Sequence, residues 1–306
     1  MINMSKNIQI IDRATGEITV EKVYGKKALA FLYSDTFFSK IFLVLLSKLP
    51  FFSRFYGFLQ KRKFSKKKIL PFIRQYDVKA EEFEKKIEEY KSFNDFFIRK
   101  LKKKARHIAE GEDVAVLPAD GRYMVFQNIN LSDGFYVKGA KFDLYSFLQD
   151  KSLAAKYHKG SMVIARLCPT DYHRFHFPFD CFAAQPRRIN GYLYSVNPLA
   201  VRKNINIFSE NKRVITLLET DNFADVLYIE VGATNVGSIC MSFIPNTRNK
   251  KGEEKGYFAL GGSSIVLLFE ENKIKFDKDL IINSEKRIET KANFGQSLGI
   301  SQDGLI

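Results

Sequence analysis

The chain has 306 residues, of which 45% are hydrophobic and 27% are charged. This composition argues against a disordered or fibrous protein and supports one large domain, or one domain with an appendage. The formal net charge of +15 favours a polyanionic partner, either nucleic acid or an anionic membrane surface. The first 25 residues lack the apolar core of a signal peptide. The cysteines, Cys168, Cys181 and Cys240, suggest neither a disulfide framework nor paired metal ligands, so we expect a reducing compartment.

Residues 1–25 are polar with a weak alternation of isoleucine and valine, which predicts a small β-hairpin across Ala14–Gly16. Residues 26–105 have a helical character. Within them, Phe37–Leu59 reads FFSKIFLVLLSKLPFFSRFYGFL and is long enough to span a membrane. Lysine and arginine interrupt this stretch and Pro50 would break a helix, so we expect two short amphipathic helices on either side of that proline instead.

A basic run follows this aromatic stretch. Apolar aromatics beside clustered lysines are typical of a segment that lies in the headgroup plane of an anionic membrane. The same pattern also fits helices that pack on the rest of the protein and leave their lysines in solvent. Nucleic acid could attract the charge as well, but the chain has no RNA-recognition, zinc-finger or helix-turn-helix signature. The run consists of Lys61, Arg62, Lys63, Lys66, Lys67 and Lys68.

The string SFNDFFIRKL lies between the basic run and the second half of the chain. Ser92 and Asn94 are candidate N-caps for a short helix there, and a second basic run, Lys100–Arg106, follows. From about residue 113 onward, β-branched and aromatic runs are cut by glycine, asparagine and aspartate. This part of the chain is therefore expected to be rich in β-strands with a few short helices.

The segment Gly256–Glu270, GYFALGGSSIVLLFE, contains two apolar runs separated by Gly261, Gly262, Ser263 and Ser264. As plain structure it predicts a buried β-hairpin with a glycine-rich turn. A second interpretation is chemical, because glycine leaves its carbonyl open to attack and tolerates unusual dihedral angles. The next hydroxyl can then attack the Gly262 carbonyl and shift the acyl group from nitrogen to oxygen. Elimination and hydrolysis would turn that serine into a pyruvoyl group, provided that a base and an oxyanion donor are present.

Candidate bases lie in LCPTDYHRFHF, residues 167–177, where His173 and His176 are three residues apart. This spacing puts the two side chains on opposite faces of a strand but on one face of a helical turn. Zinc binding lacks support, since no cysteine or acidic residue stands at a familiar ligand spacing. Asp120, in LPADGRYMV, is a candidate carboxylate to orient a histidine and precedes a strand expected to begin near Arg122. The same Pro-Ala-Asp-Gly sequence is also an ordinary turn.

Taken together, these segments resemble the phosphatidylserine decarboxylases in both content and order. The family pattern is an Asp-Gly turn, an Asp-Tyr-His-Arg-x-His-x-Pro segment, a glycine-rich segment ending Val-Gly-Ser-Ile and a cleaved Gly-Ser pair. The resemblance covers roughly residues 90–300, and KSFNDFFIRKL, KGAKFDLYSFL, GYLYSVNPLAV and NKRV also look familiar. The four motifs here are Asp120-Gly121, Asp171–Pro178, Val231–Ile239 and Gly262-Ser263.

The resemblance implies a role for each motif residue. Ser263 is the residue that becomes the pyruvoyl group, after cleavage of the Gly262–Ser263 bond. His176 resembles the base of self-cleavage, Asp120 would orient it, and His173 resembles the histidine close to the substrate. The cut site departs from the common Leu-Gly-Ser-Thr, because this chain has Leu-Gly-Gly-Ser-Ser. A cut before Ser264 is disfavoured, because the attacked carbonyl would then belong to serine instead of glycine.

The implied activity is decarboxylation of phosphatidylserine to phosphatidylethanolamine and CO₂. A covalent pyruvoyl cofactor would form a Schiff base with the substrate amine and accept the electron pair, and no metal is implied. The resemblance also implies a zymogen cleaved into chains 1–262 (beta) and 263–306 (alpha), and a homodimer. Because the implied substrate is a lipid, we expect Phe37–Leu59 and the lysines after it to attach the protein peripherally to the cytoplasmic face of the cell membrane.

We expect an α+β fold. Residues 1–105 would form the N-terminal hairpin and the helical membrane-associating region, and residues 106–306 a β-rich catalytic domain of barrel or sandwich type. Two alternatives remain open at this point. One is a pyruvoyl enzyme for a soluble amino acid, and the other is an uncleaved relative that binds membranes or nucleic acid.

Overall fold

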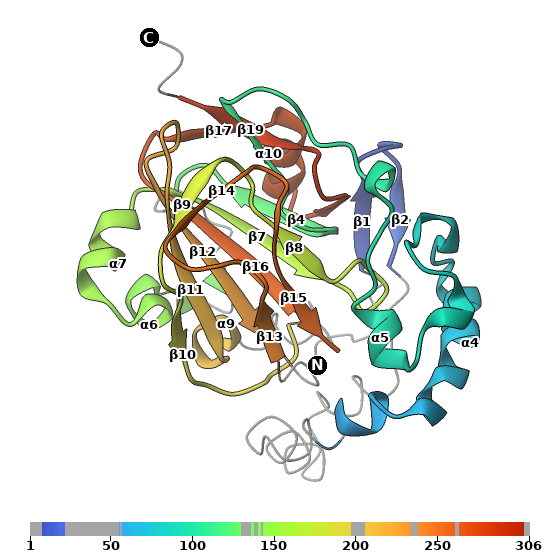
Figure 1. The fold of residues 1–306 in the computed structure, drawn as a ribbon. Coiled ribbons are helices and arrows are strands. Elements are labelled where there is room, and N and C mark those ends of the chain that lie inside the picture. The colour runs from blue at the N-terminus through green and yellow to red at the C-terminus, as the bar shows by residue number, and fades with distance from the viewer. Residues whose placement is uncertain are drawn as a thin grey trace.

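The computed structural model describes most of the chain as one layered α+β assembly (Figure 1). It confirms the α+β class predicted from the sequence. The stretch Phe37–Leu59 falls mostly outside the described part, so the two predicted helices beside Pro50 stay predictions. The described residues are 8–21, 55, 57–129, 136–137, 140–141, 143–196, 206–233, 238–260 and 263–302.

An eleven-stranded sheet forms the centre of the molecule. In spatial order, ten of its strands run through β14 (Thr247–Asn249), β9 (Cys181–Ala183), β11 (Arg213–Glu219), β12 (Asp225–Gly232), β16 (Ser263–Phe269), β7 (Ser161–Leu167), β4 (Gly121–Phe126), β18 (Glu289–Ala292), β1 (Gln9–Asp12) and β2 (Ile18–Val20). The eleventh strand, β10 (Arg187–Ile189), pairs with β11 outside this order.

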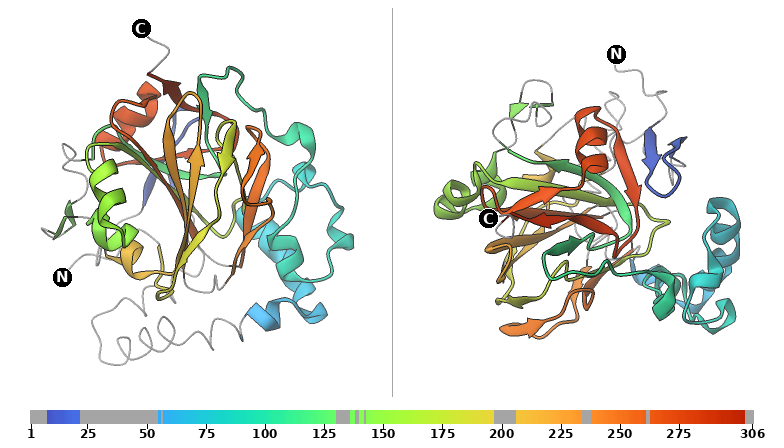
Figure 2. Two further views of the ribbon diagram at one scale, coloured as in Figure 1. Left: turned by 60° about the vertical axis from the view of Figure 1, so that its left-hand side comes forward. Right: turned by 90° about the horizontal axis from the view of Figure 1, so that it is seen from above.

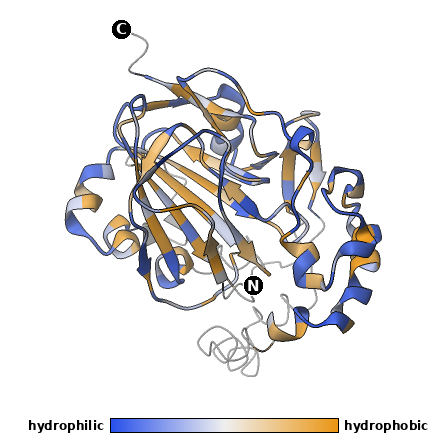
Figure 3. Cartoon of the chain, viewed as in Figure 1, coloured by the Kyte–Doolittle hydropathy of each residue, from blue (hydrophilic) through white to orange (hydrophobic). Residues whose placement is uncertain are grey.

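The central strands are buried on both faces, which explains their uninterrupted apolar sequences. Along β16, Ile265 and Leu267 enter one core cluster, whereas Val266 and Leu268 enter the other. Figure 3 shows the hydrophobic residues concentrated along β7, β12 and β16.

Three smaller sheets and several short helices surround this centre (Figure 2). Within the described residues, the strands stay in separate open sheets, so the barrel alternative is wrong. The first small sheet contains β13 (Ser238–Met241), β15 (Glu254–Ala259) and β8 (Arg174–His176), the second β17 (Ile274–Phe276), β19 (Ser297–Ser301) and β3 (Val114–Val116), and the third β5 (Tyr136–Val137) and β6 (Ala140–Lys141).

The small sheet of β13, β15 and β8 packs against the large one. Phe175 of β8 and Phe258 of β15 share a core cluster with Tyr228 of β12, and the rings of Phe175 and Tyr228 lie 6.1 Å apart. Two sheets thus meet face to face through aromatic side chains, as in a sandwich.

The predicted N-terminal hairpin is confirmed. β1 and β2 pair antiparallel across the turn, in which Gly16 has a φ of 73° that favours glycine. The predicted hairpin around Gly261–Ser264 is wrong. β15 pairs with β13 and β8, whereas β16 pairs with β12 and β7, so the glycine-rich segment connects two different sheets.

The described part of the region before residue 105 contains α4 (Ile69–Tyr76), α5 (Phe93–Phe97) and four short 3-10 helices, while the predicted membrane-associating role of this region stays a prediction. Ser92 caps α5 by accepting a hydrogen bond from the Asp95 N–H, whereas Asn94 lies inside the helix. Within the described residues, no helix is long and apolar enough to cross a membrane. The 3-10 helices are Lys63–Lys68, Ala80–Glu82, Ile87–Glu89 and Lys103–Ala105.

The remaining helices lie around the large sheet. α6 and α7 lie on the side of the molecule opposite to α4 and α5 (Figure 2), and α10 packs on β4. Their bounds are α6 (Leu144–Leu148), α7 (Lys151–Tyr157), α9 (Ile207–Glu210) and α10 (Lys278–Glu285).

Candidate active site

Ser263 is the first residue of β16, at the point where the chain enters the large sheet. Its register partners are Gly232 at the end of β12 and Leu167 at the end of β7. The side chain is fully buried, and Ser263 Oγ has no hydrogen-bond partner among the residues that the structure describes. Gly262 lies outside those residues. A buried hydroxyl without a partner costs free energy, so this serine is a candidate for chemistry.

The face of the sheet that carries Ser263 can be read from the strand alternation. Ser263, Ile265 and Leu267 lie on one face, and this face packs against the small sheet that contains β8 and β15. Ser264 lies on the opposite face. The serine hydroxyl therefore points toward the layer between the two sheets.

The segment that contains the two histidines begins beside Ser263, because Leu167 at the end of β7 is its register partner. His173 precedes β8, is fully buried, and its Nδ1 lies 2.9 Å from Asp171 O. Its own main-chain oxygen accepts a hydrogen bond from the Phe258 N–H at 2.9 Å. Phe258 is five residues before Ser263 in the sequence, so His173 lies opposite the part of β15 that leads to the Gly262–Ser263 bond.

His176 ends β8 in different surroundings. Its Nδ1 lies 3.0 Å from Gly252 O, its Nε2 lies 3.3 Å from the Tyr172 hydroxyl, and its ring stacks on Phe294 at a centroid distance of 3.7 Å. Burial lowers the pKa of His176 to about 4, because the charged imidazole loses its hydration. A carbonyl oxygen only accepts, so Nδ1 carries the proton and the neutral Nε2 accepts the hydrogen bond from Tyr172.

The two histidines thus lie on an extended segment and have different neighbours. His176 is opposite Glu254 at the start of β15, while His173 is opposite Phe258 near its end. The spacing of the two histidines was compatible with a strand or with a helical turn. The structure has an extended chain here, which turns the two side chains to opposite sides.

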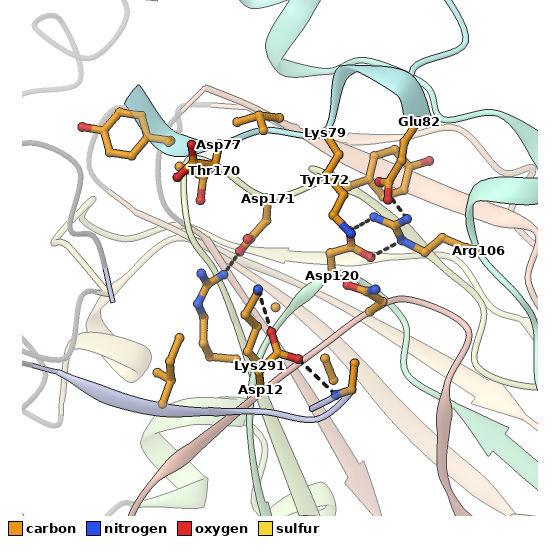
Figure 4. Close-up of a pocket in the computed structure, with 18 of the residues that line it drawn as sticks. Asp12, Asp77, Lys79, Glu82, Arg106, Asp120, Thr170, Asp171, Tyr172 and Lys291 are labelled. Carbon is orange, nitrogen blue, oxygen red and sulfur yellow. Dashed lines mark hydrogen bonds and ion pairs between the residues drawn. The ribbon is translucent and has the colours of Figure 1, made fainter. Parts of the chain in front are cut away.

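Asp120 directly precedes β4, as the sequence predicted. Its carboxylate accepts hydrogen bonds from Arg106 at 2.9 and 2.5 Å (Figure 4). It also accepts one from the main-chain N–H of Phe294 at 2.8 Å. The sequence hypothesis had Asp120 orient His176 directly. In the structure, the ring nitrogens of His176 bind Gly252 and Tyr172, and Asp120 reaches His176 through Phe294, whose ring stacks on the imidazole.

A cavity of about 420 Å³ lies next to Asp120 (Figure 4). Its lining includes Asp120, Asp171 and Tyr172, but Ser263 and the two histidines are not part of it. The cavity therefore adjoins one candidate residue, Asp120, and is not the space around Ser263.

Beside this cavity is a network of buried charges that the sequence reasoning missed. Glu21 pairs with Arg122 at 2.8 Å and with Arg166 at 2.9 Å, Arg122 also pairs with Asp171, and Arg166 with Glu289 at 2.5 Å. The coulombic attraction of both arginines lowers the pKa of Glu21 in spite of its burial, and the carboxylate stays charged. The available signal was two arginines inside otherwise apolar strands, which implies buried partners.

Four further residues support the histidines and were not singled out from the sequence: Phe97, Arg99, Tyr172 and Phe294. Phe97 and Arg99 contact the His173 segment, and Tyr172 and Phe294 contact His176. Three of them lie within strings quoted for the family resemblance, KSFNDFFIRKL and DYHRFHFP, so these strings contain both candidate histidines and three of the residues that contact them or their segment.

Comparison with known proteins gives one consistent result. Residues 93–300 match the model of the family described as phosphatidylserine decarboxylase. The chain is 49% identical over 296 residues to the phosphatidylserine decarboxylase proenzyme of Chlamydia caviae, which covers 97% of this chain and 99% of the relative. It is 47% identical over 294 residues to the proenzyme of the same name from Fusobacterium nucleatum, covering 96% and 98%. The chain therefore belongs to the phosphatidylserine decarboxylase family.

Proposed function

We propose that this chain is a zymogen that cuts itself at Gly262–Ser263 and decarboxylates phosphatidylserine to phosphatidylethanolamine. The observation that carries the proposal is Ser263, whose hydroxyl is buried without a described partner at the start of β16, directly after two glycines. The relatives' common designation as proenzymes supports a precursor that is processed.

Self-cleavage needs only the protein's own atoms and one water. Ser263 Oγ attacks the Gly262 carbonyl carbon, the C–N bond breaks, and an ester joins Gly262 to the serine oxygen. Loss of the α-proton of Ser263 expels the Gly262 carboxylate and leaves dehydroalanine. Water then replaces the nitrogen, which leaves as ammonia, and residue 263 becomes a pyruvoyl group. A buried hydroxyl that has no partner among the described residues fits this nucleophile.

We assign proton transfer in the cleavage to His176. An imidazole that is neutral because burial lowers its pKa can accept a proton at any pH well above 4. Its Nε2 carries the lone pair that would take up the proton, and in the uncut chain this atom accepts the hydrogen bond from the Tyr172 hydroxyl. Asp120 supports this arrangement through Phe294 and through its own ion pair with Arg106.

His173 is assigned to the decarboxylation step. When present, the pyruvoyl group condenses with the substrate amine and accepts the electron pair left by the departing CO₂. His173 is buried opposite the strand that leads to Ser263, with Nδ1 committed to Asp171 O, so Nε2 is the atom able to hold or deliver a proton.

The lipid substrate also calls for contact with a membrane. We propose peripheral attachment to the cytoplasmic face, through Phe37–Leu59 and the residues that follow it. Among the described neighbours, Phe58, Phe64 and Leu70 are about half exposed and lie among exposed lysines and Arg62. Aromatic and basic side chains together suit an anionic headgroup layer.

Intact-mass measurement of the purified protein tests the central step. We expect fragments of residues 1–262 and 263–306, the second blocked at its N-terminus by pyruvoyl, together with phosphatidylserine decarboxylation in vesicles. Ser263→Ala should remain one chain without activity. A single uncut chain that still decarboxylates, or a cut chain active only on free serine, would refute the proposal.

A further inference from the structure

Three consecutive residues, the last residue of α5 and the two that follow it, hold the segment around His173. The Phe97 ring lies on the His173 ring at a centroid distance of 4.0 Å, Ile98 O accepts from Arg174 Nε at 3.0 Å, and Arg99 donates to two main-chain oxygens of the segment. Figure 1 shows α5 beside the end of the small sheet, between that sheet and α4. The contacts reach the chain both before and after His173.

Arg99 is the most unusual of the three. Only 4% of it is exposed, and its guanidinium lies 5.1 Å from the rings of Phe83 and Phe96. Its Nη2 donates to Thr170 O at 3.1 Å and to Asp171 O at 3.0 Å. Burying a guanidinium is costly, and here the described hydrogen bonds go to the main chain instead of a carboxylate. These bonds hold the main chain at Thr170 and Asp171, just before His173.

One carbonyl connects Arg99 to the imidazole. Asp171 O accepts from Arg99 Nη2 at 3.0 Å and lies 2.9 Å from His173 Nδ1. Because the carbonyl can only accept, the proton of a neutral His173 is on Nδ1, and Nε2 is left with its lone pair. Arg99 therefore holds in place Asp171 O, the atom that favours the Nδ1–H tautomer of His173.

Phe97 restricts the orientation of the His173 ring plane. It is buried and covers one face of the His173 imidazole with an interplanar angle of 39°. The next residue in the chain, Arg174, donates hydrogen bonds to Ile98 O and to both carboxylate oxygens of Glu254, the latter at 2.7 and 2.8 Å. The imidazole is therefore confined by a ring on its face and by anchored residues on both sides in the chain.

We propose that Phe97 and Arg99 are positioning residues for His173: they select its Nδ1–H tautomer and aim Nε2 for proton transfer in the decarboxylation. This inference rests on the assignment of His173 under the proposed function. The end of the N-terminal helical region would then help to position a residue of the active site, in addition to its proposed role in membrane attachment.

The tautomer is tested without any activity, in the full uncut chain Ser263→Ala labelled with ¹⁵N-histidine. The chain has only four histidines, and His173→Gln assigns the signal of interest. We expect Nδ1–H at neutral pH in the parent, and a shift toward a mixture of tautomers with Arg99→Lys. The matched control is Arg213→Lys, because Arg213 is also fully buried, also donates to main-chain oxygens and also lies over a phenylalanine, Phe147.

The kinetic arm uses cleaved enzyme and vesicles that contain phosphatidylserine. Phe97→Leu keeps the apolar volume but loses the ring, and its control is Phe179→Leu, since Phe179 stacks on Phe223 in the core. We expect kcat to fall by roughly 10- to 100-fold with Phe97→Leu and Arg99→Lys, while KM changes little, as is typical of a misplaced catalytic group. Completion of self-cleavage serves as the report of correct folding.

The outcomes separate clearly. Unchanged His173 tautomer and kcat in both variants, relative to their controls, would overturn the inference. If Arg99→Lys fails to fold, Phe97→Leu decides with the same two readouts. If the parent enzyme cuts itself but does not decarboxylate the lipid, the proposed function fails, while the tautomer measurement still decides whether Phe97 and Arg99 position His173.

Discussion

The ring of Phe294 stacks on the ring of His176 with a centroid distance of 3.7 Å and an interplanar angle of 13°. The main-chain N–H of the same phenylalanine donates to Asp120 at 2.8 Å. A carboxylate and an imidazole are thus linked by one intervening residue. Asp120 holds Phe294 in place, and Phe294 holds one face of the imidazole.

This relay predicts different results for two changes at Asp120. Asp120→Asn keeps an oxygen that can accept from Phe294 and loses the charge that pairs with Arg106, whereas Asp120→Ala loses both. We therefore expect Asp120→Asn to slow self-cleavage and Asp120→Ala to slow it much more. Cell-free synthesis followed by gel densitometry measures both rates. Equal rates for the two variants would mean that Phe294 is not held through Asp120.

The proposed role of His176 as the base predicts how self-cleavage depends on pH. Its pKa is about 4 in the folded protein because burial disfavours the imidazolium. The base is neutral above that value, so the cleavage rate should be flat from pH 8 to about pH 5 and reach half its value near pH 4. A midpoint close to 6.5, the value of an exposed histidine, would show that the group titrating in cleavage is not this buried imidazole.

The same shift predicts how stability depends on pH. Between about pH 4 and 6.5 the unfolded chain binds a proton at His176 that the folded chain rejects, so the free energy of unfolding rises with pH across this window. From below pH 4 to above pH 6.5, this one group raises the free energy of unfolding by about 3 kcal/mol in total, and above pH 6.5 it causes no further change. Urea unfolding of uncut Ser263→Ala, with and without His176→Gln, measures it as the difference between the two pH profiles.

The sequence predicted local elements of the fold better than the pairing of its strands. The β1–β2 hairpin followed from a local turn sequence, and it is present. The hairpin predicted around Gly261–Ser264 was just as well supported locally, yet β15 and β16 pair with other strands. Periodicity says that a segment is a buried strand, but its pairing partner is set by packing far along the chain.

At the site, specific strings proposed Asp120, His173, His176 and Ser263 as candidates, while the residues that surround them could not be predicted. Glu21 illustrates why. It pairs with Arg122 and Arg166, which are more than a hundred residues further along the chain. No local pattern connects such residues, and they meet only because β1 and β2 join the edge of the sheet.

A buried ion pair between β15 and β12 gives a further prediction. Lys255 Nζ lies 2.5 Å from Glu230 Oε1 and 2.9 Å from Thr216 Oγ1, and both charged side chains are fully buried. Lys255→Met leaves the carboxylate without its partner and should cost about 3–5 kcal/mol of stability. The double variant Glu230→Leu with Lys255→Met should recover most of that loss, because no unpaired charge remains. Urea unfolding of the Ser263→Ala chain, followed by circular dichroism because the chain has no tryptophan, decides between these outcomes.

The last prediction concerns membrane attachment. Lys66 and Lys67 are exposed in the 3-10 helix that also carries the half-exposed Phe64. Each basic residue near an anionic surface contributes about 1 kcal/mol, so removing two positive charges should weaken binding by roughly 30-fold. We expect Lys66→Glu with Lys67→Glu to bind phosphatidylserine vesicles at least that much more weakly than the parent, and the difference should shrink at high salt.

The matched control reverses two charges elsewhere. Lys278 and Lys286 are exposed at α10 and its C-cap, near the half-exposed Ile282, and α10 lies away from α4 in Figure 1. Lys278→Glu with Lys286→Glu changes the net charge by the same amount. If attachment depended on overall charge alone, both pairs would weaken vesicle binding equally. A loss confined to the first pair would instead locate the contact at the 3-10 helix, because only that pair lies beside exposed aromatic side chains and the basic run.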